Sequence, residues 1–120
     1  MDLQGILEET LNKISGATYV SCVGMDGIAL SQAIKEVPFD PAVADAEFAN
    51  IVGHGLKAIE SIDGGDFEEM FFSTSKFLVL IRKINKDAFL AIAIKGDVKN
   101  LGLARIQAKK SAEDLKKVLE

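Results

Sequence analysis

The stretch Tyr19–Ile34, YVSCVGMDGIALSQAI, places an Asp-Gly pair between two short apolar runs. Asp26-Gly27 in this setting is one of the strongest local signals for a β-hairpin, because the turn needs a positive φ that glycine adopts without steric cost. A phosphate-binding or metal-binding loop is the alternative, but the corner lacks the partner residues that either ligand requires. We therefore predict strands at Thr18–Val23 and Ile28–Ile34, joined by this corner.

Apolar spacing divides the rest of the chain into helices and strands. Apolar residues three and four apart predict a first helix over Asp2–Ser15, which Gly16 ends. Asp40 is an expected N-cap, with Pro41 as the first residue of a middle helix that runs to about Ile62. The remaining predicted elements are strands at Phe67–Ser73, Phe77–Ile84 and Ala88–Ile94, and a last helix over about Asn100–Leu119.

The element order is α-β-β-α-β-β-β-α, which predicts an α+β fold around one five-stranded antiparallel sheet. In Phe77–Ile81 and Phe89–Ile94 both alternating sets of side chains are apolar, so both faces of the sheet must be covered. We expect the terminal helices on one face and the middle helix on the other. With 120 residues and no internal repeat or linker, residues 1–120 are expected to form one domain.

Composition excludes several function classes. A net charge of −4 and a pI near 5.0 argue against general nucleic-acid binding. The apolar runs fall far short of the roughly 18 residues that a membrane span needs, and the N-terminus lacks the features of a secretory signal. The single cysteine, Cys22, is interpreted as a buried thiol in a reducing compartment. The expected location is the cytoplasm.

Few residues of the chain could take part in catalysis or in metal binding. His54 is the only histidine and Cys22 the only cysteine, so a zinc site has no ligand set, and no catalytic spacing is present. Gly53-His54-Gly55 lies inside a predicted helix and is not a dinucleotide fingerprint, and no GxxxxGK[ST] loop occurs. His54 is interpreted as a solvated side chain. The prediction is a protein without its own enzymatic activity, cofactor or metal.

The strand predicted after the middle helix should lie at the far edge of the sheet. An unpaired edge that carries Phe71 and Phe72 would be an aggregation hazard unless another strand pairs with it. The same strand of a second copy is the simplest partner, which gives an isologous twofold dimer. The expected dimer-interface residues are Phe67, Glu69, Met70, Phe71 and Phe72.

The middle helix also carries more apolar surface than one sheet needs. Its large apolar residues span roughly 160° of the helix, wider than the stripe of about 100° typical of a surface helix. A shoulder of small residues, Ala46, Ala49 and Gly53, lies beside them. Gly53 and Gly55 each cost on the order of 1 kcal/mol against alanine. Either these glycines relieve a clash with the chain's own sheet, or the shoulder accepts a partner chain.

Several motifs in order resemble the Roadblock domain over nearly the whole chain. They are the helix end Ile14–Ala17, the corner Val23–Gly27, the three-stranded meander and the NLGLAR sequence at Asn100–Arg105. That family includes the roadblock-type dynein light chains and the bacterial gliding-motility regulators that act on a small Ras-like GTPase. The resemblance implies a profilin-like α+β arrangement.

The resemblance further implies a homodimer, or a heterodimer with a paralogue, with paired third strands and middle helices side by side. It implies a regulatory or scaffolding role toward a Ras-like GTPase, which docks near the middle helices, without a cofactor. Mapped onto this sequence, the expected partner-binding residues are Ala46, Ala49, Asn50, Gly53 and Lys57. Two alternatives stay open: an adaptor subunit of a motor or signalling complex, and a small-molecule sensor, although no interior polar cluster is evident to orient a ligand.

Overall fold

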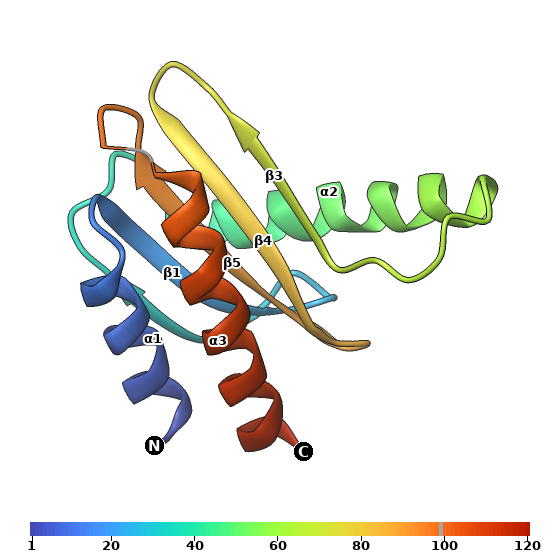
Figure 1. Cartoon of the computed structure of the whole chain (residues 1–120), viewed down its shortest axis with the longest axis horizontal. Helices are drawn as coiled ribbons and strands as arrows, with labels where there is room; N and C mark the ends of the chain where they lie inside the picture. The colour runs from blue at the N-terminus through green and yellow to red at the C-terminus, as the bar shows by residue number, and fades with distance from the viewer. Residues whose placement is uncertain (99) are drawn as a thin grey trace.

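A computed structural model describes residues 1–98 and 100–120, and its elements follow the predicted order. They are α1 (Leu3–Lys13), β1 (Ala17–Gly24), β2 (Ala29–Ile34), α2 (Pro41–Ser61), β3 (Glu69–Ser73), β4 (Phe77–Asn85), β5 (Ala88–Lys95) and α3 (Leu101–Leu119). Across the described residues the strands form one antiparallel sheet in the order β2-β1-β5-β4-β3 (Figure 1). The predicted fold class is confirmed, and β3 is an edge strand as expected.

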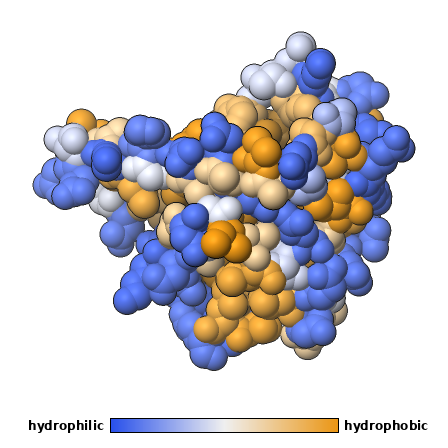
Figure 2. Space-filling view, turned by 180° about the vertical axis from the view of Figure 1, so that it is seen from behind, coloured by the Kyte–Doolittle hydropathy of each residue, from blue (hydrophilic) through white to orange (hydrophobic). Residues whose placement is uncertain are grey.

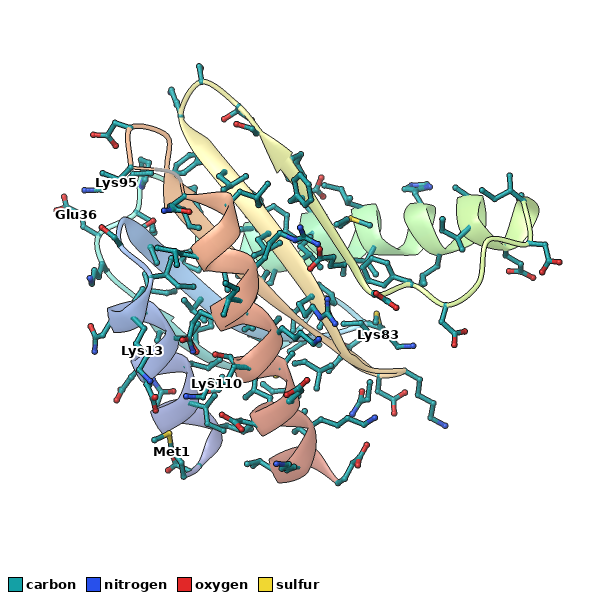
Figure 3. The ribbon with its side chains drawn as sticks, viewed as in Figure 1. Met1, Lys13, Glu36, Lys83, Lys95 and Lys110 are labelled. Carbon is teal, nitrogen blue, oxygen red and sulfur yellow. The ribbon has the colours of Figure 1, made fainter. Side chains whose placement is uncertain are left out.

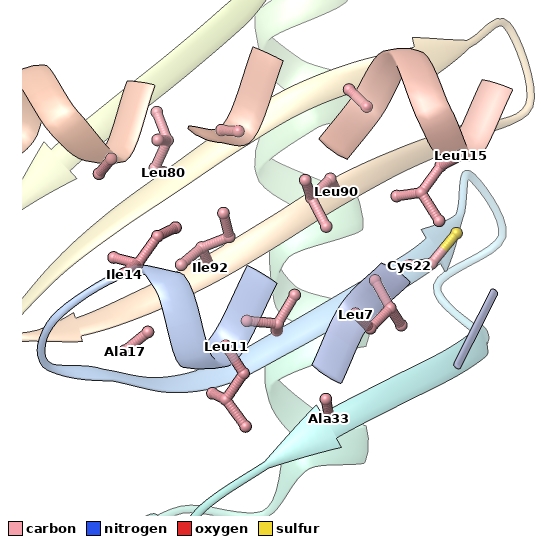
Figure 4. Packing of buried hydrophobic residues seen from close by; sticks show 14 of the residues in the cluster. Leu7, Leu11, Ile14, Ala17, Cys22, Ala33, Leu80, Leu90, Ile92 and Leu115 are labelled. Carbon is pink, nitrogen blue, oxygen red and sulfur yellow. The ribbon is translucent and has the colours of Figure 1, made fainter. Parts of the chain in front are cut away.

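Two apolar clusters cover the two faces of the sheet. On one face α1 and α3 pack side by side, with Leu7 and Leu11 of α1 over β1 and Leu115 of α3 near Leu90 of β5 (Figure 4). On the other face α2 packs against a second cluster that includes Tyr19, Val52 and Phe89. Both faces of these strands are apolar because each face contacts a helix, as the sequence predicts.

Side-chain caps begin the two longer helices where the sequence places them. The Asp40 carboxylate accepts a hydrogen bond from the Ala42 N–H at 2.9 Å, and Pro41 is the first residue of α2. The Asn100 side chain accepts from the Leu103 N–H at 3.1 Å. Each cap satisfies a backbone donor that has no partner inside the helix.

The first helix ends earlier than predicted, at Lys13 and not at Ser15. The chain turns sharply at Gly16, whose φ is +82°, and a Cβ there would stand 2.0 Å from Val98 Cγ2. Only glycine fits this turn, because a side chain would be strained by the φ angle and would also collide with Val98.

The third strand begins at Glu69, two residues later than predicted. Phe67 precedes the strand and is buried within its own chain, where it joins the cluster under α2. The backbone carbonyl of Glu68 accepts the first hydrogen bond from β4, from the Lys83 N–H at 2.9 Å.

The middle helix is longer than the sheet that supports it. Its 21 residues span about 31 Å at 1.5 Å per residue, and Figure 1 shows its second half running past β3. Its buried residues, Asp45 and Val52, both lie in the part that crosses the sheet. Ile62, just past the end of the helix, is 73% exposed. The second half of α2 thus extends beyond its own sheet (Figure 1 and Figure 3).

Candidate functional site

A buried polar cluster fixes the first half of α2 to the sheet. The Asp45 carboxylate is 2% exposed and accepts hydrogen bonds from the Tyr19 hydroxyl, from Ser21 Oγ at 2.9 Å and from Gln32 Nε2 at 2.6 Å. Burial raises the pKa of Tyr19, and the hydrogen bond and negative charge of Asp45 raise it further. These bonds join α2 to both β1 and β2.

The expectation that the chain has no interior polar cluster is therefore wrong. The signal for it was present, because Asp45 precedes Val52 by seven residues and so lies on the same side of α2. A carboxylate at that position needs buried donors, which the adjacent strands supply. The sequence alone does not identify these donors, because they come together only when β1 and β2 pair in register.

The corner between β1 and β2 packs directly against the predicted partner-binding shoulder of α2. Gly27 has a φ of +87°, and a Cβ there would stand 3.2 Å from Ala46 Cα and 3.7 Å from Ala49 Cβ. The Asp26 carboxylate accepts from the Ile28 N–H at 3.1 Å, which stabilises the turn. Small residues at Ala46 and Ala49 thus let the corner approach the helix.

The two helix glycines have different surroundings. A Cβ on Gly55 would stand 2.8 Å from Met70 Cε, whereas a Cβ on Gly53 would have nothing within 4 Å. Two residues apart, they point about 200° away from each other around the helix. Gly55 relieves a contact with the chain's own β3 strand, and Gly53 faces open space. The clash interpretation from the sequence therefore holds for Gly55, and a partner chain at Gly53 stays a prediction.

The structure thereby separates two flanks of α2. The corner-side flank carries the predicted partner residues: Ala46, Asn50 and Lys57 are exposed, and Ala49 and Gly53 are half-buried. The β3-side flank carries Ile51, which is 39% exposed, and leads to Ile62 beyond the edge of the sheet. Figure 2 shows the molecule from behind, the side on which α2 lies, and hydrophilic and hydrophobic residues are mixed along the projecting arm.

The predicted interface residues of β3 point to both faces of the sheet. Phe72 packs on the α2 side, with its ring centroid 6.2 Å from that of Phe48, and Met70 reaches Gly55. Phe71 lies on the α3 side, where the Arg105 guanidinium carbon is 5.9 Å from its ring centroid. Phe71 is 46% exposed. The strand therefore presents apolar surface on each side of its open edge.

Glu69 joins this edge to α3 and β4. Its carboxylate accepts from Arg105 Nε at 2.6 Å and forms an ion pair with Arg82 Nη1 at 3.1 Å. Burial raises the pKa of Glu69, but the hydrogen bonds from Arg105 and Arg82, together with their positive charges, outweigh it and hold the pKa below its ordinary value. The charge on Glu69 thus helps to hold α3 over this end of the sheet.

The two edges of the sheet differ in how they are covered. At β2, the Gln4 side chain of α1 donates to the Gln32 carbonyl at 2.8 Å and accepts from Ser31 Oγ at 2.6 Å. At β3, no further strand lies beyond the edge in the described parts of the chain. A side chain that occupies the backbone of an edge strand opposes pairing with another chain, so β3 is the more open edge.

Two residues considered for catalysis or metal binding, His54 and Cys22, lie in different surroundings. His54 is exposed on α2, and Cys22 is fully buried, with its pKa raised to about 11 by burial. Within residues 1–98 and 100–120, no three His, Cys, Asp or Glu side chains are grouped to hold a metal ion. None of the helices described has the length and apolarity needed to cross a membrane.

The chain is similar to known proteins in its structure. No family model and no curated protein matches the sequence. The structure is similar to Myxococcus xanthus MglB, with a TM-score of 0.88 and 19% identity over 97% of this chain and 86% of that one. It is also similar to a Roadblock/LC7 domain from Streptomyces avermitilis, with a TM-score of 0.86 and 16% identity over 99% and 98% of the two chains.

Two further solved structures extend the comparison. Myxococcus xanthus MglC is 28% identical, with a TM-score of 0.67 over 94% of this chain and 95% of that one. Profilin IA from Acanthamoeba castellanii has a TM-score of 0.64 and 15% identity over 95% and 96% of the two chains. An α+β domain with a five-stranded sheet between one helix and a helix pair is the class that these structures share with this chain. The chain has the fold of a Roadblock-type domain.

Proposed function

We propose that this protein is a dimeric regulator or scaffold that binds a small Ras-like GTPase in the cytoplasm and modulates its nucleotide cycle. The observation that carries the proposal is the separation of two partly exposed flanks of α2, one beside β3 and one beside the β1–β2 corner. The resemblance to gliding-motility regulators supports it, and one structural neighbour is described as a gliding protein, MglB from Thermus thermophilus.

The dimer surface is the β3 edge together with the β3-side flank of α2. Pairing of β3 with the same strand of a second copy would satisfy its open edge. The half of α2 that runs past β3 would then lie over the partner subunit, where Ile51 and Ile62 find apolar neighbours. Phe71 and Phe72 would flank the twofold axis on opposite faces of the joined sheet. A homodimer is the simplest form, and a heterodimer with a paralogue uses the same surfaces.

The GTPase surface is the corner-side flank of α2, with Ala46, Ala49, Asn50, Gly53 and Lys57 as its contact residues. Gly53 faces open space, which lets the backbone of a partner approach α2 closely. Because the corner and the Asp45 cluster fix this part of α2, the surface is already ordered before binding, which lowers the entropic cost of association. Any effect on hydrolysis would come from repositioning the catalytic groups of the GTPase.

The test measures GTP hydrolysis by each Ras-like GTPase encoded near this gene, with and without the protein. We expect binding and a changed rate, and loss of both in Gly53→Glu, while light scattering still gives twice the 12.9 kDa chain mass. The control is His54→Glu, which adds the same charge to an exposed neighbouring position. The absence of binding and of any rate change with all these GTPases would overturn the proposal.

Two other results would change the proposed function. Dissociation of the dimer by Gly53→Glu would assign the corner-side flank to the subunit interface. Binding of a GTPase without any change in its hydrolysis or exchange rate would favour the second candidate, an adaptor subunit. The open edge and the overhanging helix support that candidate equally, since they concern only assembly.

A further inference from the structure

The outer side of α3 carries two adjacent exposed apolar side chains. Leu103 is 65% exposed and Ile106 is 70% exposed, and residues three apart are neighbours on the surface of a helix. The other side of α3 packs on the sheet through Ala104, Ala108 and Leu115, which are fully buried. Leu103 and Ile106 therefore form a small apolar surface that points away from the sheet and stays largely exposed.

Lysine side chains extend this surface along the helix. Lys110 and Lys117 follow Ile106 by four and eleven residues, which is about one and three helical turns, so they lie on the same side of α3. Both are exposed, as are the three other basic residues of the helix. α3 holds five basic residues against two acidic ones, in a chain whose net charge is −4. The outer side of α3 is thus both basic and apolar.

The acidic residues of the neighbouring helix α1 have partners on α1 itself. Glu9 forms an ion pair with Lys13, with 2.5 Å between the nitrogen and the oxygen. Glu8 accepts a hydrogen bond from Gln4, which also contacts the β2 edge, so Glu8 lies on the side of α1 that faces away from α3. These carboxylates therefore add little negative charge to the outer side of α3.

Negative charge is concentrated on the opposite side of the molecule. Residues 40–68, which comprise α2 and the loop that follows it, hold seven acidic residues and one lysine. α2 covers the sheet face opposite to α1 and α3 (Figure 1). A negatively charged surface would attract the α3 side and repel the α2 side, which favours one orientation of the protein on it.

The β3–β3 dimer of the proposed function would double the basic and apolar surface. The twofold axis that pairs two identical antiparallel edge strands is perpendicular to the sheet, so both α3 helices lie on the same face of the joined sheet. Two copies of Leu103, Ile106, Lys110 and Lys117 would then face in one direction. Such a repeated surface suits an extended flat partner, because linked weak contacts strengthen one another.

An anionic phospholipid bilayer has the chemistry that matches this surface. Its headgroups attract clustered lysines, and the attraction acts within a Debye length of about 8 Å at physiological salt. Its apolar region begins directly beneath the headgroups and accepts leucine and isoleucine side chains. A nucleic acid would attract the lysines but would leave Leu103 and Ile106 without apolar neighbours.

We propose that the dimer docks on membranes rich in anionic phospholipid through the outer sides of its two α3 helices. Leu103 and Ile106 enter the headgroup region, and Lys110 and Lys117 contact headgroup phosphates. The inference rests on the dimer of the proposed function, but not on its GTPase. The flanks of α2 would face away from the membrane, so a GTPase bound there would be held close to the membrane while α3 stays in contact with lipid.

Flotation with lipid vesicles measures the docking. One set of vesicles contains equal amounts of phosphatidylglycerol and phosphatidylcholine, and the control set contains phosphatidylcholine alone. The protein should float with the anionic vesicles and at least about tenfold less with the neutral ones. Raising the salt concentration from about 0.1 M to about 1 M shortens the Debye length from about 10 Å to about 3 Å and should release most of the bound protein.

A tryptophan reporter locates the contact, because the chain contains no tryptophan of its own. The emission of Ile106→Trp should shift to shorter wavelength by about 10 nm with anionic vesicles, since the indole ring enters the headgroup region. Val43→Trp is the matched control. Val43 is 57% exposed on α2, on the other side of the sheet, and the emission of this variant should not shift.

A matched pair of double variants tests the apolar contact. Leu103→Ser combined with Ile106→Ser should weaken binding to anionic vesicles at least about tenfold, because it removes both side chains that enter the headgroup region. The control combines Ile28→Ser with Val43→Ser, at positions outside α3 that are 67% and 57% exposed. The control should bind within about twofold of the unmodified protein.

A matched pair of charge reversals tests the basic contact. Lys110→Glu should weaken binding to anionic vesicles at least about tenfold, since each dimer then presents two additional negative charges to the headgroups. Lys35→Glu makes the same charge change at an exposed position just after β2 and should bind within about twofold of the unmodified protein. All substituted positions are exposed, so we expect every variant to fold, which circular dichroism checks.

Several results would overturn the proposal. They are a dimer that does not float, equal flotation with both sets of vesicles, and equal losses in the matched variants. Binding to soluble polyglutamate but not to vesicles would also overturn it and would assign the surface to an acidic protein. A dimer that does not float leaves the proposed function standing, whereas a chain that is monomeric by light scattering overturns both.

Discussion

The Asp45 carboxylate of α2 accepts a hydrogen bond from the Tyr19 hydroxyl of β1, and both side chains are buried. This contact lies in the half of α2 that crosses the sheet, next to the shoulder that we assign to a partner. The cluster around Asp45 therefore determines how the exposed flanks of α2 are presented, although none of its members is itself exposed.

Replacing Asp45 by alanine should lower the free energy of unfolding by about 3 kcal/mol, because Tyr19, Ser21 and Gln32 lose their shared acceptor in a buried site. Asp45→Asn keeps an acceptor for the two hydroxyls and should cost only about 1 kcal/mol. Urea denaturation at one fixed protein concentration measures both. Equal losses in the two variants would show that the donors find other partners.

Gly27→Ala should lower the free energy of unfolding by about 2 kcal/mol, because the new Cβ meets both a positive φ and the backbone of α2 at Ala46. Gly65→Ala is the matched control, since Gly65 has a φ of +85° but nothing within 4 Å of its Cβ position. The difference between the two variants isolates the contact with α2. Identical losses would mean that the corner does not press on the helix.

Gly53→Ala should raise the free energy of unfolding by about 0.5–1 kcal/mol, because alanine favours a helix interior and the added Cβ has open space. The same change should weaken GTPase binding if the glycine admits a partner backbone. Thermal or urea unfolding and a binding titration give the two effects separately. A loss of stability would contradict the open surroundings of Gly53.

The contribution of Glu69 to stability should depend on pH. Its pKa in the folded chain is lowered, so the stabilisation is present above its unfolded pKa of about 4.5 and is lost as the pH falls through the lower folded value. The difference in unfolding free energy between the unmodified protein and Glu69→Gln should therefore shrink below about pH 4.5. Glu113→Gln, on the exposed face of α3, is the control. A difference that stays constant from pH 7 to pH 3 would exclude the ionic role.

Cys22 should resist alkylation by iodoacetamide in the folded protein at pH 8 and react readily in urea. Its side chain is fully buried, and a pKa of about 11 leaves only about one thousandth of the thiol ionised at pH 8. Mass spectrometry of the labelled chain measures the reaction. Rapid modification without denaturant would show that the core around β1 opens.

The local elements could be predicted from the sequence because their signals are short-range. The Asp26-Gly27 corner, the Asp40-Pro41 helix start and the all-apolar run of β5 each depend on a few neighbouring residues. The observed boundaries differ from the predicted ones by one or two residues. Phe67 precedes β3 and is buried under α2, and α1 ends at Lys13, ahead of the turn at Gly16.

The sequence by itself determined the fold class, the position of β3 at an edge and the small residues on α2. Only the tertiary structure decided which side of α2 each small residue faces, and hence that Gly55 meets β3 while Gly53 stays open. It also decided that Asp45 finds three donors and that Phe71 remains uncovered beside α3. The physical reason is that periodicity fixes a direction around a helix, whereas the neighbour in that direction comes from strands far away in the chain.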